Sequence, residues 1–197
     1  MSERNIYLLL TDTGTWFSRM IKLYTKAPYN HASISLDENL KELYSFGRKV
    51  YFNPLSGGFI KEGVDRGVFL YKKNTKCIVY KMVVSEFQYN EILKRIAQFK
   101  YFEDQYRYNL LGVMGIAMNK RIKRKNAFTC SQFVASVLDA SNIYVFDKYI
   151  ELITPEDITK IPQLQLIYEG KLCDYHQHKI AVFDSAIFDW NQYKADY

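Results

Sequence analysis

The sequence lacks any long apolar run. None of its 197 residues falls in a stretch approaching the roughly 20 consecutive apolar residues of a membrane-spanning helix. The first residues, MSERN, lead directly into a short apolar segment, without the regions of a secretory signal peptide. We therefore expect a cytoplasmic protein, with a lost leader or unconventional export left open.

Cysteine is also scarce. Cys77, Cys130 and Cys173 are odd in number and far apart, which indicates reduced thiols and not a disulfide framework. The one candidate metal cluster is CDYHQH at 173–178, where Cys173, His176 and His178 lie close together without an evident fourth ligand. We therefore predict neither a metal nor a cofactor.

Charge of one sign is only slightly in excess, with 27 Lys and Arg against 21 Asp and Glu and a net charge of +6. Five cations lie within residues 119–126: Lys120, Arg121, Lys123, Arg124 and Lys125. No aromatic residues interleave with them and no nucleic-acid-binding signature is present, so we do not expect nucleic acid as a partner. The run is either a solvated connection or a rim that attracts anionic substrates or membrane headgroups.

Apolar and aromatic residues are abundant, at 48% and 16% of the chain. This composition is typical of a globular protein with a substantial core. We predict one domain over residues 1–170, followed by a docked C-terminal tail over residues 171–197. The 17 Tyr and 13 Phe exceed the usual needs of a core, so some are expected to line a groove or a partner surface.

The periodicity of apolar residues predicts an α+β fold, with helices packed on an antiparallel sheet. Strands are expected at residues 6–10, 31–36, 43–47, 77–83 and 164–168. Helices are expected over residues 16–24, after a capping box at 85–88, over 130–141, and after a cap at Thr154. The PLSGG segment at 54–58 is interpreted as a loop, followed by a strand or extended segment up to Tyr71.

Cys130 is the strongest candidate for chemistry. It follows a cap residue, Thr129, and precedes an amphipathic run, which places its thiol in the first turn of a helix. Free backbone N–H groups and the positive end of the helix dipole favour a thiolate there. The alternative is a small buried core residue. Cys130 lies before the apolar stripe that begins at Phe133, and packing alone does not call for sulfur at this position.

His31 is the candidate base. In NHASIS at 30–35 the apolar residues alternate, so His31 lies on the opposite, polar face of the predicted strand. The alternative is a half-buried histidine with satisfied hydrogen bonds. A nucleophile at a helix start and a base on a strand is the arrangement of papain-like cysteine enzymes. Here the histidine comes first in the chain, which indicates a circular permutation.

Three motifs, NHASIS at 30–35, YNLLG at 108–112 and TCSQFV at 129–134, carry a resemblance to a known family. The chain resembles the circularly permuted branch of the NlpC-type papain-like superfamily, represented by the YiiX-like proteins, over residues 6–168. The resemblance implies a permuted papain-like fold in which an antiparallel sheet packs against helices and the nucleophile lies at a helix N-terminus.

The resemblance also implies roles for particular residues. Cys130 matches the nucleophile and His31 the general base. Ser45 matches the third member, which orients the imidazole from the strand after the histidine strand. Many relatives have a carboxylate there, and a serine stabilises imidazolium less strongly. Tyr108 matches a tyrosine that lends a hydroxyl to the cleft, and Ser131 follows the nucleophile at the oxyanion side, where the Cys130 N–H is expected to act.

The expected activity is that of a cysteine amidase or peptidase, hydrolysing an amide or ester through an acyl-enzyme. A small molecule, a peptide or an acylated compound would be the substrate. Two alternatives remain open. One is a non-catalytic binding protein that keeps the papain-like cleft, and the other is a structural or interaction protein that uses the aromatic tail as its contact surface.

Overall fold

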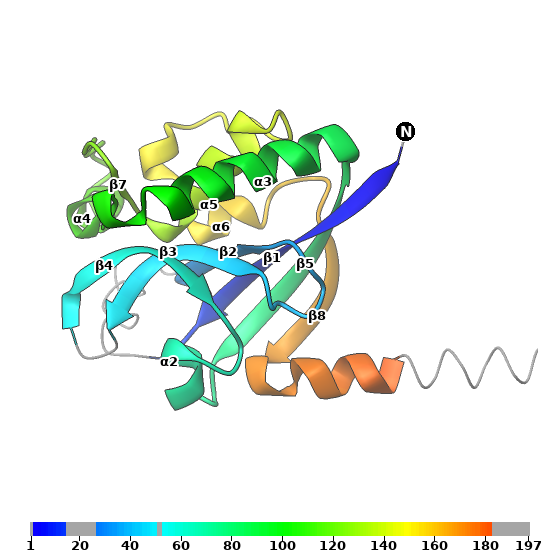
Figure 1. Ribbon diagram of the computed structural model, residues 1–197. Helices are drawn as coiled ribbons and strands as arrows, with labels where there is room; N and C mark the ends of the chain where they lie inside the picture. Colours follow the sequence, from blue (N-terminus) through cyan, green and yellow to red (C-terminus); the bar gives the residue numbers. More distant parts are fainter. Residues whose placement is uncertain (1, 15–26, 51–52, 183–197) are drawn as a thin grey trace, which may run out of the picture.

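A six-stranded antiparallel sheet forms the centre of the molecule, in the order β4-β3-β2-β1-β5-β8 (Figure 1). The computed structural model describes residues 2–14, 27–50 and 53–182. The strands of the sheet are β1 (Glu3–Asp12), β2 (His31–Ser35), β3 (Leu43–Val50), β4 (Asn53–Glu62), β5 (Lys76–Ser85) and β8 (Gln165–Lys171).

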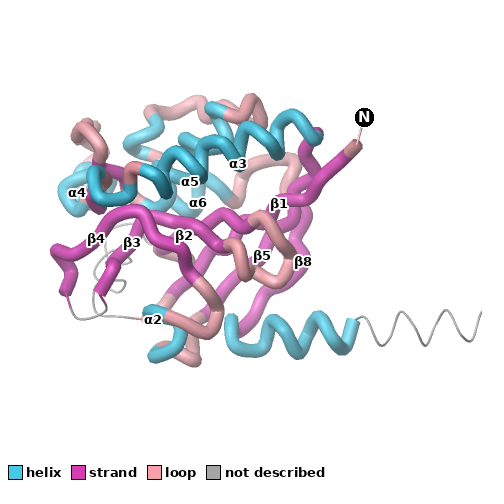
Figure 2. Tube along the Cα trace, viewed as in Figure 1, coloured by secondary structure: helices cyan, strands magenta, loops and turns pink. Residues whose placement is uncertain are grey.

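Helices cover both faces of this sheet. One face carries α3 (Glu86–Tyr101), α5 (Cys130–Ala140) and α6 (Pro155–Ile158), whereas α2 (Gly67–Tyr71) and the helical segment 175–182 lie on the other (Figures 1 and 2). Between α3 and α5 the chain forms β6 (Arg107–Tyr108), α4 (Leu110–Ala117) and β7 (Ala127–Phe128). The short 3-10 helices are η1 (Glu103–Gln105), η2 (Ile150–Leu152) and η3 (Leu172–Asp174). The predicted α+β architecture is confirmed.

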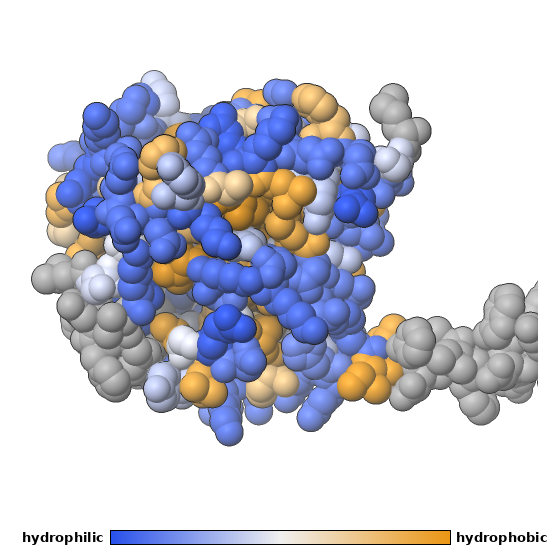
Figure 3. Space-filling model, viewed as in Figure 1, coloured by the Kyte–Doolittle hydropathy of each residue, from blue (hydrophilic) through white to orange (hydrophobic). Residues whose placement is uncertain are grey.

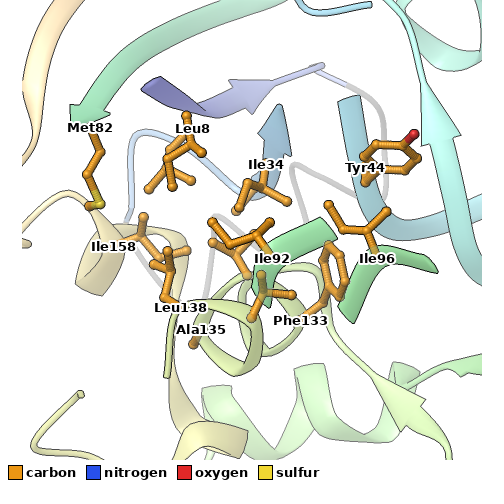
Figure 4. Close-up of a cluster of buried hydrophobic side chains, with 14 of the residues drawn as sticks. Leu8, Ile34, Tyr44, Met82, Ile92, Ile96, Phe133, Ala135, Leu138 and Ile158 are labelled. Carbon is orange, nitrogen blue, oxygen red and sulfur yellow. The ribbon is translucent and has the colours of Figure 1, made fainter. Parts of the chain in front are cut away.

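Strand β1 lies at the centre and is buried on both faces, which explains why its sequence is a continuous apolar run. Ile6, Leu8 and Leu10 enter the helix-side core, while Tyr7 and Leu9 enter the core on the opposite face. Figure 4 shows the helix-side core, where side chains from the sheet meet those of α3, α5 and α6. Two layers of packing therefore fix β1 and, through it, the neighbouring β2.

The predicted helix starts are confirmed by their caps. The side chain of Ser85 accepts the N–H of Gln88, and Thr129 accepts the N–H of Gln132, with a capping box in both cases. Thr154 begins α6 in the same way. Such caps contribute about 1 kcal/mol each. The cap at Thr129 defines the position at which the helix begins, and hence the position of Cys130.

Two sequence interpretations are corrected. The segment 54–58, expected as a loop, lies within β4, and the strand or extended segment expected after it is a strand as far as Glu62 but ends in α2 and not in extended chain. The glycines of β4 serve close packing and not a turn: a Cβ atom at Gly57 would lie 2.6 Å from the Cβ atom of Tyr108. The helix expected over 16–24 lies outside the described residues.

The boundary expected at residue 170 falls inside β8. Leu172 and Tyr175 are almost completely buried in the second core, and the Tyr175 hydroxyl donates to the carbonyl of Glu38 at 2.8 Å. The first residues of the expected tail are thus part of the domain.

Over the described ranges, none of the helices combines the length and the apolar character that crossing a membrane requires.

Candidate active site

His31 is the first residue of β2 and is held by a carboxylate. Its Nε2–H donates to Oε1 of Glu62 at 2.8 Å. The side chains of His31 and Glu62 are only 18% and 11% exposed, so the pair is largely shielded from water. The Ser33 hydroxyl donates to the other oxygen of Glu62, and its Oγ lies 3.4 Å from Nε2 of His31. Both carboxylate oxygens are therefore fixed.

Glu62 reaches His31 across an intervening strand. It is the last residue of β4, and β3 lies between β4 and β2 in the sheet. Two neighbouring residues of β3 on this face are small: Ser45 is buried, and a Cβ atom at Gly47 would lie 3.6 Å from Cε1 of the His31 ring. Small side chains on the middle strand give the longer Glu62 side chain the room to cross it.

The position expected for Ser45 is corrected by this geometry. Its hydroxyl donates to the carbonyl of Ala32 at 2.6 Å, and Glu62 occupies the place beside the imidazole. Ser45 is completely buried between its neighbouring strands. The residue beside the imidazole comes from the second strand after the histidine strand and not from the first.

Cys130 is buried and is the first residue of α5. The thiol of Cys130 lies close enough to the imidazole of His31 to affect the pKa of that ring. Burial acts to lower the pKa of His31, but the charge of Glu62, the neighbouring Cys130 thiol and the hydrogen bond to Glu62 raise it well above its usual value. The surroundings of His31 thus stabilise an imidazolium between a carboxylate and a thiol.

The backbone around Cys130 offers unused hydrogen-bond donors. The Thr129 side chain accepts the N–H of Gln132, and the Thr129 carbonyl accepts that of Phe133 at 3.0 Å. The N–H groups of Cys130 and Ser131 fall outside these cap bonds, as expected at the start of a helix. Backbone N–H groups at the start of a helix are the groups that best stabilise an anion.

Tyr108 and Ser131, both expected at the cleft, differ in placement. Tyr108 pairs with Phe128 in the parallel β6–β7 pair, two residues before Cys130. Burial and the electrostatic effect of the neighbouring Cys130 raise the pKa of its phenol well above the usual value, so it remains protonated. The Ser131 hydroxyl instead donates to the carbonyl of Ile153 at 2.5 Å, and this bond anchors the start of α5. The structure brings together His31, Cys130 and Tyr108, whereas the hydroxyls of Ser45 and Ser131 make structural bonds.

The two other thiols lie in different surroundings. Burial raises the pKa of Cys77 to about 12, and a hydrogen bond to Asp174 raises that of Cys173. In the described part of the chain, no group of three or more His, Cys, Asp or Glu side chains is arranged to hold a metal ion. In the CDYHQH segment the two histidine rings have different neighbours: the ring of His176 packs against Tyr175, and the ring of His178 packs against Tyr168.

All five cations of the basic run are exposed, but Arg121 differs from the other four in being paired with a buried carboxylate. Arg121 makes a bidentate pair with the buried Glu151, at 3.0 and 3.2 Å, and lies over the ring of Tyr149. Lys120, Lys123, Arg124 and Lys125 are exposed.

Comparisons with known proteins identify the class of fold. No family model matches the chain, and none of the curated proteins matches it. Among solved structures, the metalloprotein YiiX from Escherichia coli O157:H7 is similar, with a TM-score of 0.52 and 13% sequence identity. The similarity covers 85% of this chain and 98% of YiiX. The chain therefore has the YiiX-like fold that its motifs predicted.

Glu62 and Ser33 are the site residues that sequence reasoning missed. Glu62 was missed because no local pattern shows that its side chain reaches across β3 to His31. Ser33 shares the polar face of β2 with His31, and that alternation was a usable signal.

Proposed function

We propose that the protein is a cysteine hydrolase of the permuted papain-like type, with Cys130 as nucleophile, His31 as base and Glu62 as the orienting carboxylate. The observation that carries the proposal is the placement of one imidazole between a thiol and a carboxylate. A nucleophile, a base and a third group that orients the base form the common constellation of covalent catalysis. The YiiX-like fold is consistent with this assignment.

In the proposed reaction the thiol proton of Cys130 passes to His31, and the Sγ atom attacks the carbonyl carbon of an amide or ester. Because Nε2 is bound to Glu62, Nδ1 is the ring nitrogen that takes this proton. The Cys130 N–H stabilises the resulting oxyanion. His31 returns the proton to the leaving amine or alcohol, and a thioester with Cys130 remains.

Water completes the cycle. His31 takes a proton from the water as its oxygen attacks the thioester carbonyl, and the thiolate leaves as the carboxylic acid forms. Glu62 keeps the imidazole oriented and stabilises its charged form at each step. Tyr108, whose phenol stays protonated beside Cys130, is proposed to donate a hydrogen bond within the cleft.

A metal is not part of the proposal, although YiiX is described as a metalloprotein. Nε2 of His31 is bound to a Glu62 oxygen at 2.8 Å, and the other Glu62 oxygen accepts the Ser33 hydroxyl. The atoms that would bind a cation are thus bound to one another. These residues do not fit a metal site, and no step is derived through one.

The non-catalytic alternative rested on a serine in the third position of the site. Because a carboxylate from β4 lies beside the imidazole, the serine at position 45 no longer argues for lost activity.

Hydrolysis of p-nitrophenyl butyrate, followed together with the intact mass of the protein, tests the proposal. We expect a burst of p-nitrophenol, an acyl adduct on Cys130, and loss of both in Cys130→Ala. His31→Ala should lower kcat about 100- to 10,000-fold, since general base catalysis typically contributes that much. Cys173→Ala is the matched control, and excess EDTA should have no effect. Turnover that persists in Cys130→Ala would refute the proposal.

A further inference from the structure

Helix α4 presents one row of large apolar side chains to solvent. Leu111, Met114 and the C-terminal cap residue Met118 are 49%, 56% and 56% exposed, whereas Gly112 and Gly115 are buried. A surface helix usually turns its large apolar residues toward the core. In α4 the fully buried positions are the glycines, while Leu111 and Met114 lie outward and the remaining large apolar residues of the helix are only half-buried.

The chain that follows α4 explains this orientation. It turns at Asn119, which has a φ of +51°, and returns along the glycine side of the helix. The Lys120 N–H donates to the Gly115 carbonyl at 2.8 Å, and a Cβ atom at Gly115 would lie 2.5 Å from the Lys120 carbonyl oxygen. The Asn109 side chain, which caps α4, also donates to the carbonyl of Ile122 at 3.3 Å. The basic run is therefore held against the helix.

The charge of this region has one sign. Residues 105–138 contain no Asp or Glu. Arg121 is engaged by Glu151, but the other cations of the run are exposed. We call the exposed set the α4 platform: Leu111, Met114, Met118, Lys120, Lys123, Arg124 and Lys125.

The α4 platform adjoins the candidate active site. It is carried on the connection between β6 and β7, which pair in parallel, so its two ends are held side by side. This connection begins directly after Tyr108 and ends at β7, two residues before Cys130. Figure 1 places α4 at one end of the molecule, far from the helical segment 175–182. In Figure 3 hydrophobic colour appears at that same edge, among hydrophilic residues.

We propose that the α4 platform binds the surface of an anionic lipid membrane. A bilayer with anionic headgroups supplies both partners that the platform needs: a negative surface for the cations and an acyl boundary for Leu and Met. Basic residues next to an exposed apolar helix face are typical of interfacial binding. A protein partner or a second copy of this chain would have to supply an acidic rim around an apolar groove. Membrane binding does not depend on the proposed hydrolysis.

Flotation of the full-length protein with vesicles tests this inference. We expect binding to vesicles of 70% phosphatidylcholine and 30% phosphatidylglycerol, weaker binding in high salt, and little binding to phosphatidylcholine alone. Lys123→Gln/Arg124→Gln/Lys125→Gln should weaken binding about 100-fold, because each cation near such a surface contributes about fivefold. Leu111→Gln/Met114→Gln should weaken it at least about tenfold.

Matched variants separate the platform from general effects. Lys73→Gln/Lys76→Gln/Lys160→Gln removes three exposed cations elsewhere, and Phe87→Gln/Leu166→Gln removes two comparably exposed apolar residues. Both should bind as the wild type does. Cys130→Ala should also bind normally, so the outcome is independent of catalysis. Absence of flotation, equal loss in the control variants, or self-association that only the platform variants abolish would overturn the proposal.

Discussion

Glu62 and His31 interact where little water screens them, and Coulomb attraction between such a close pair is on the order of 4 kcal/mol. Burial acts to lower the pKa of His31, whereas Glu62 and Cys130 act to raise it. The combined effect of Glu62 and Cys130 is the larger, so the pKa of His31 is raised. A histidine whose pKa is raised by folding stabilises the folded state fully below about pH 6.5, its unfolded value. That contribution is lost as pH rises through the pKa of the folded form.

Glu62→Gln should therefore lower the pKa of His31, because burial remains after the carboxylate charge is gone. NMR titration of the imidazole, assigned with His31→Ala, measures this shift. The loss of unfolding free energy in Glu62→Gln should be largest below about pH 6.5 and should shrink as pH rises through the pKa of His31 in the wild type. Glu42→Gln, which alters a carboxylate paired with Lys61 on the same hairpin, is the control. An unchanged His31 titration in Glu62→Gln would contradict the account.

At the scale of elements, the sequence was sufficient to predict secondary structure wherever the periodicity of apolar residues and a helix cap indicated the same element. The alternation in β2 and the cap at Thr129 predicted the placement of His31 and Cys130, because local pattern and tertiary packing favour the same structure there. It was insufficient for β4, where glycines are required by a close approach from another strand. No local pattern reports that Tyr108 packs against Gly57, or that Glu62 reaches across β3.

Gly57→Ala tests this close approach. The new Cβ atom would lie 2.6 Å from the Cβ atom of Tyr108 and 2.9 Å from the Gly47 carbonyl oxygen, so backbone must move. We expect a loss of about 1–3 kcal/mol in unfolding free energy, together with slower ester hydrolysis because Tyr108 is displaced. Denaturant unfolding and kcat/KM measure the two effects. Gly63→Ala is the control, since its Cβ atom would meet only the flexible side chain of Arg66. Equal behaviour of the two variants would argue against the close approach.

At the scale of the whole molecule, each face of the central sheet is packed against a layer of other residues, which we call its cover. The helix-side cover was predictable from the amphipathic patterns of α3 and α5. The opposite cover was not, because it is built from α2 and from residues at the start of the expected tail, neither of which shows a helical period by itself. Tyr175 anchors this cover by packing on Tyr168, with the two ring centroids 5.2 Å apart.

Tyr175→Ala should lower the unfolding free energy by about 3–5 kcal/mol, the usual cost of removing a buried aromatic side chain. Tyr175→Phe should cost about 1 kcal/mol, because it removes only the hydrogen bond to the Glu38 carbonyl. Chemical denaturation measures both values. If both variants were as stable as the wild type, the start of the tail would not belong to the domain core.

The most direct test of the central claim is the rate of iodoacetamide labelling at each cysteine as a function of pH, mapped by mass spectrometry. In the wild type, Cys130 should be labelled selectively at about pH 6, where an ordinary thiol is almost entirely protonated. Cys77 and Cys173 should react slowly, because their pKa values are raised. His31→Ala should abolish the labelling of Cys130 at low pH. A rate at Cys130 that rises only near about pH 8.5, as for a free thiol, and is identical in His31→Ala would contradict the account.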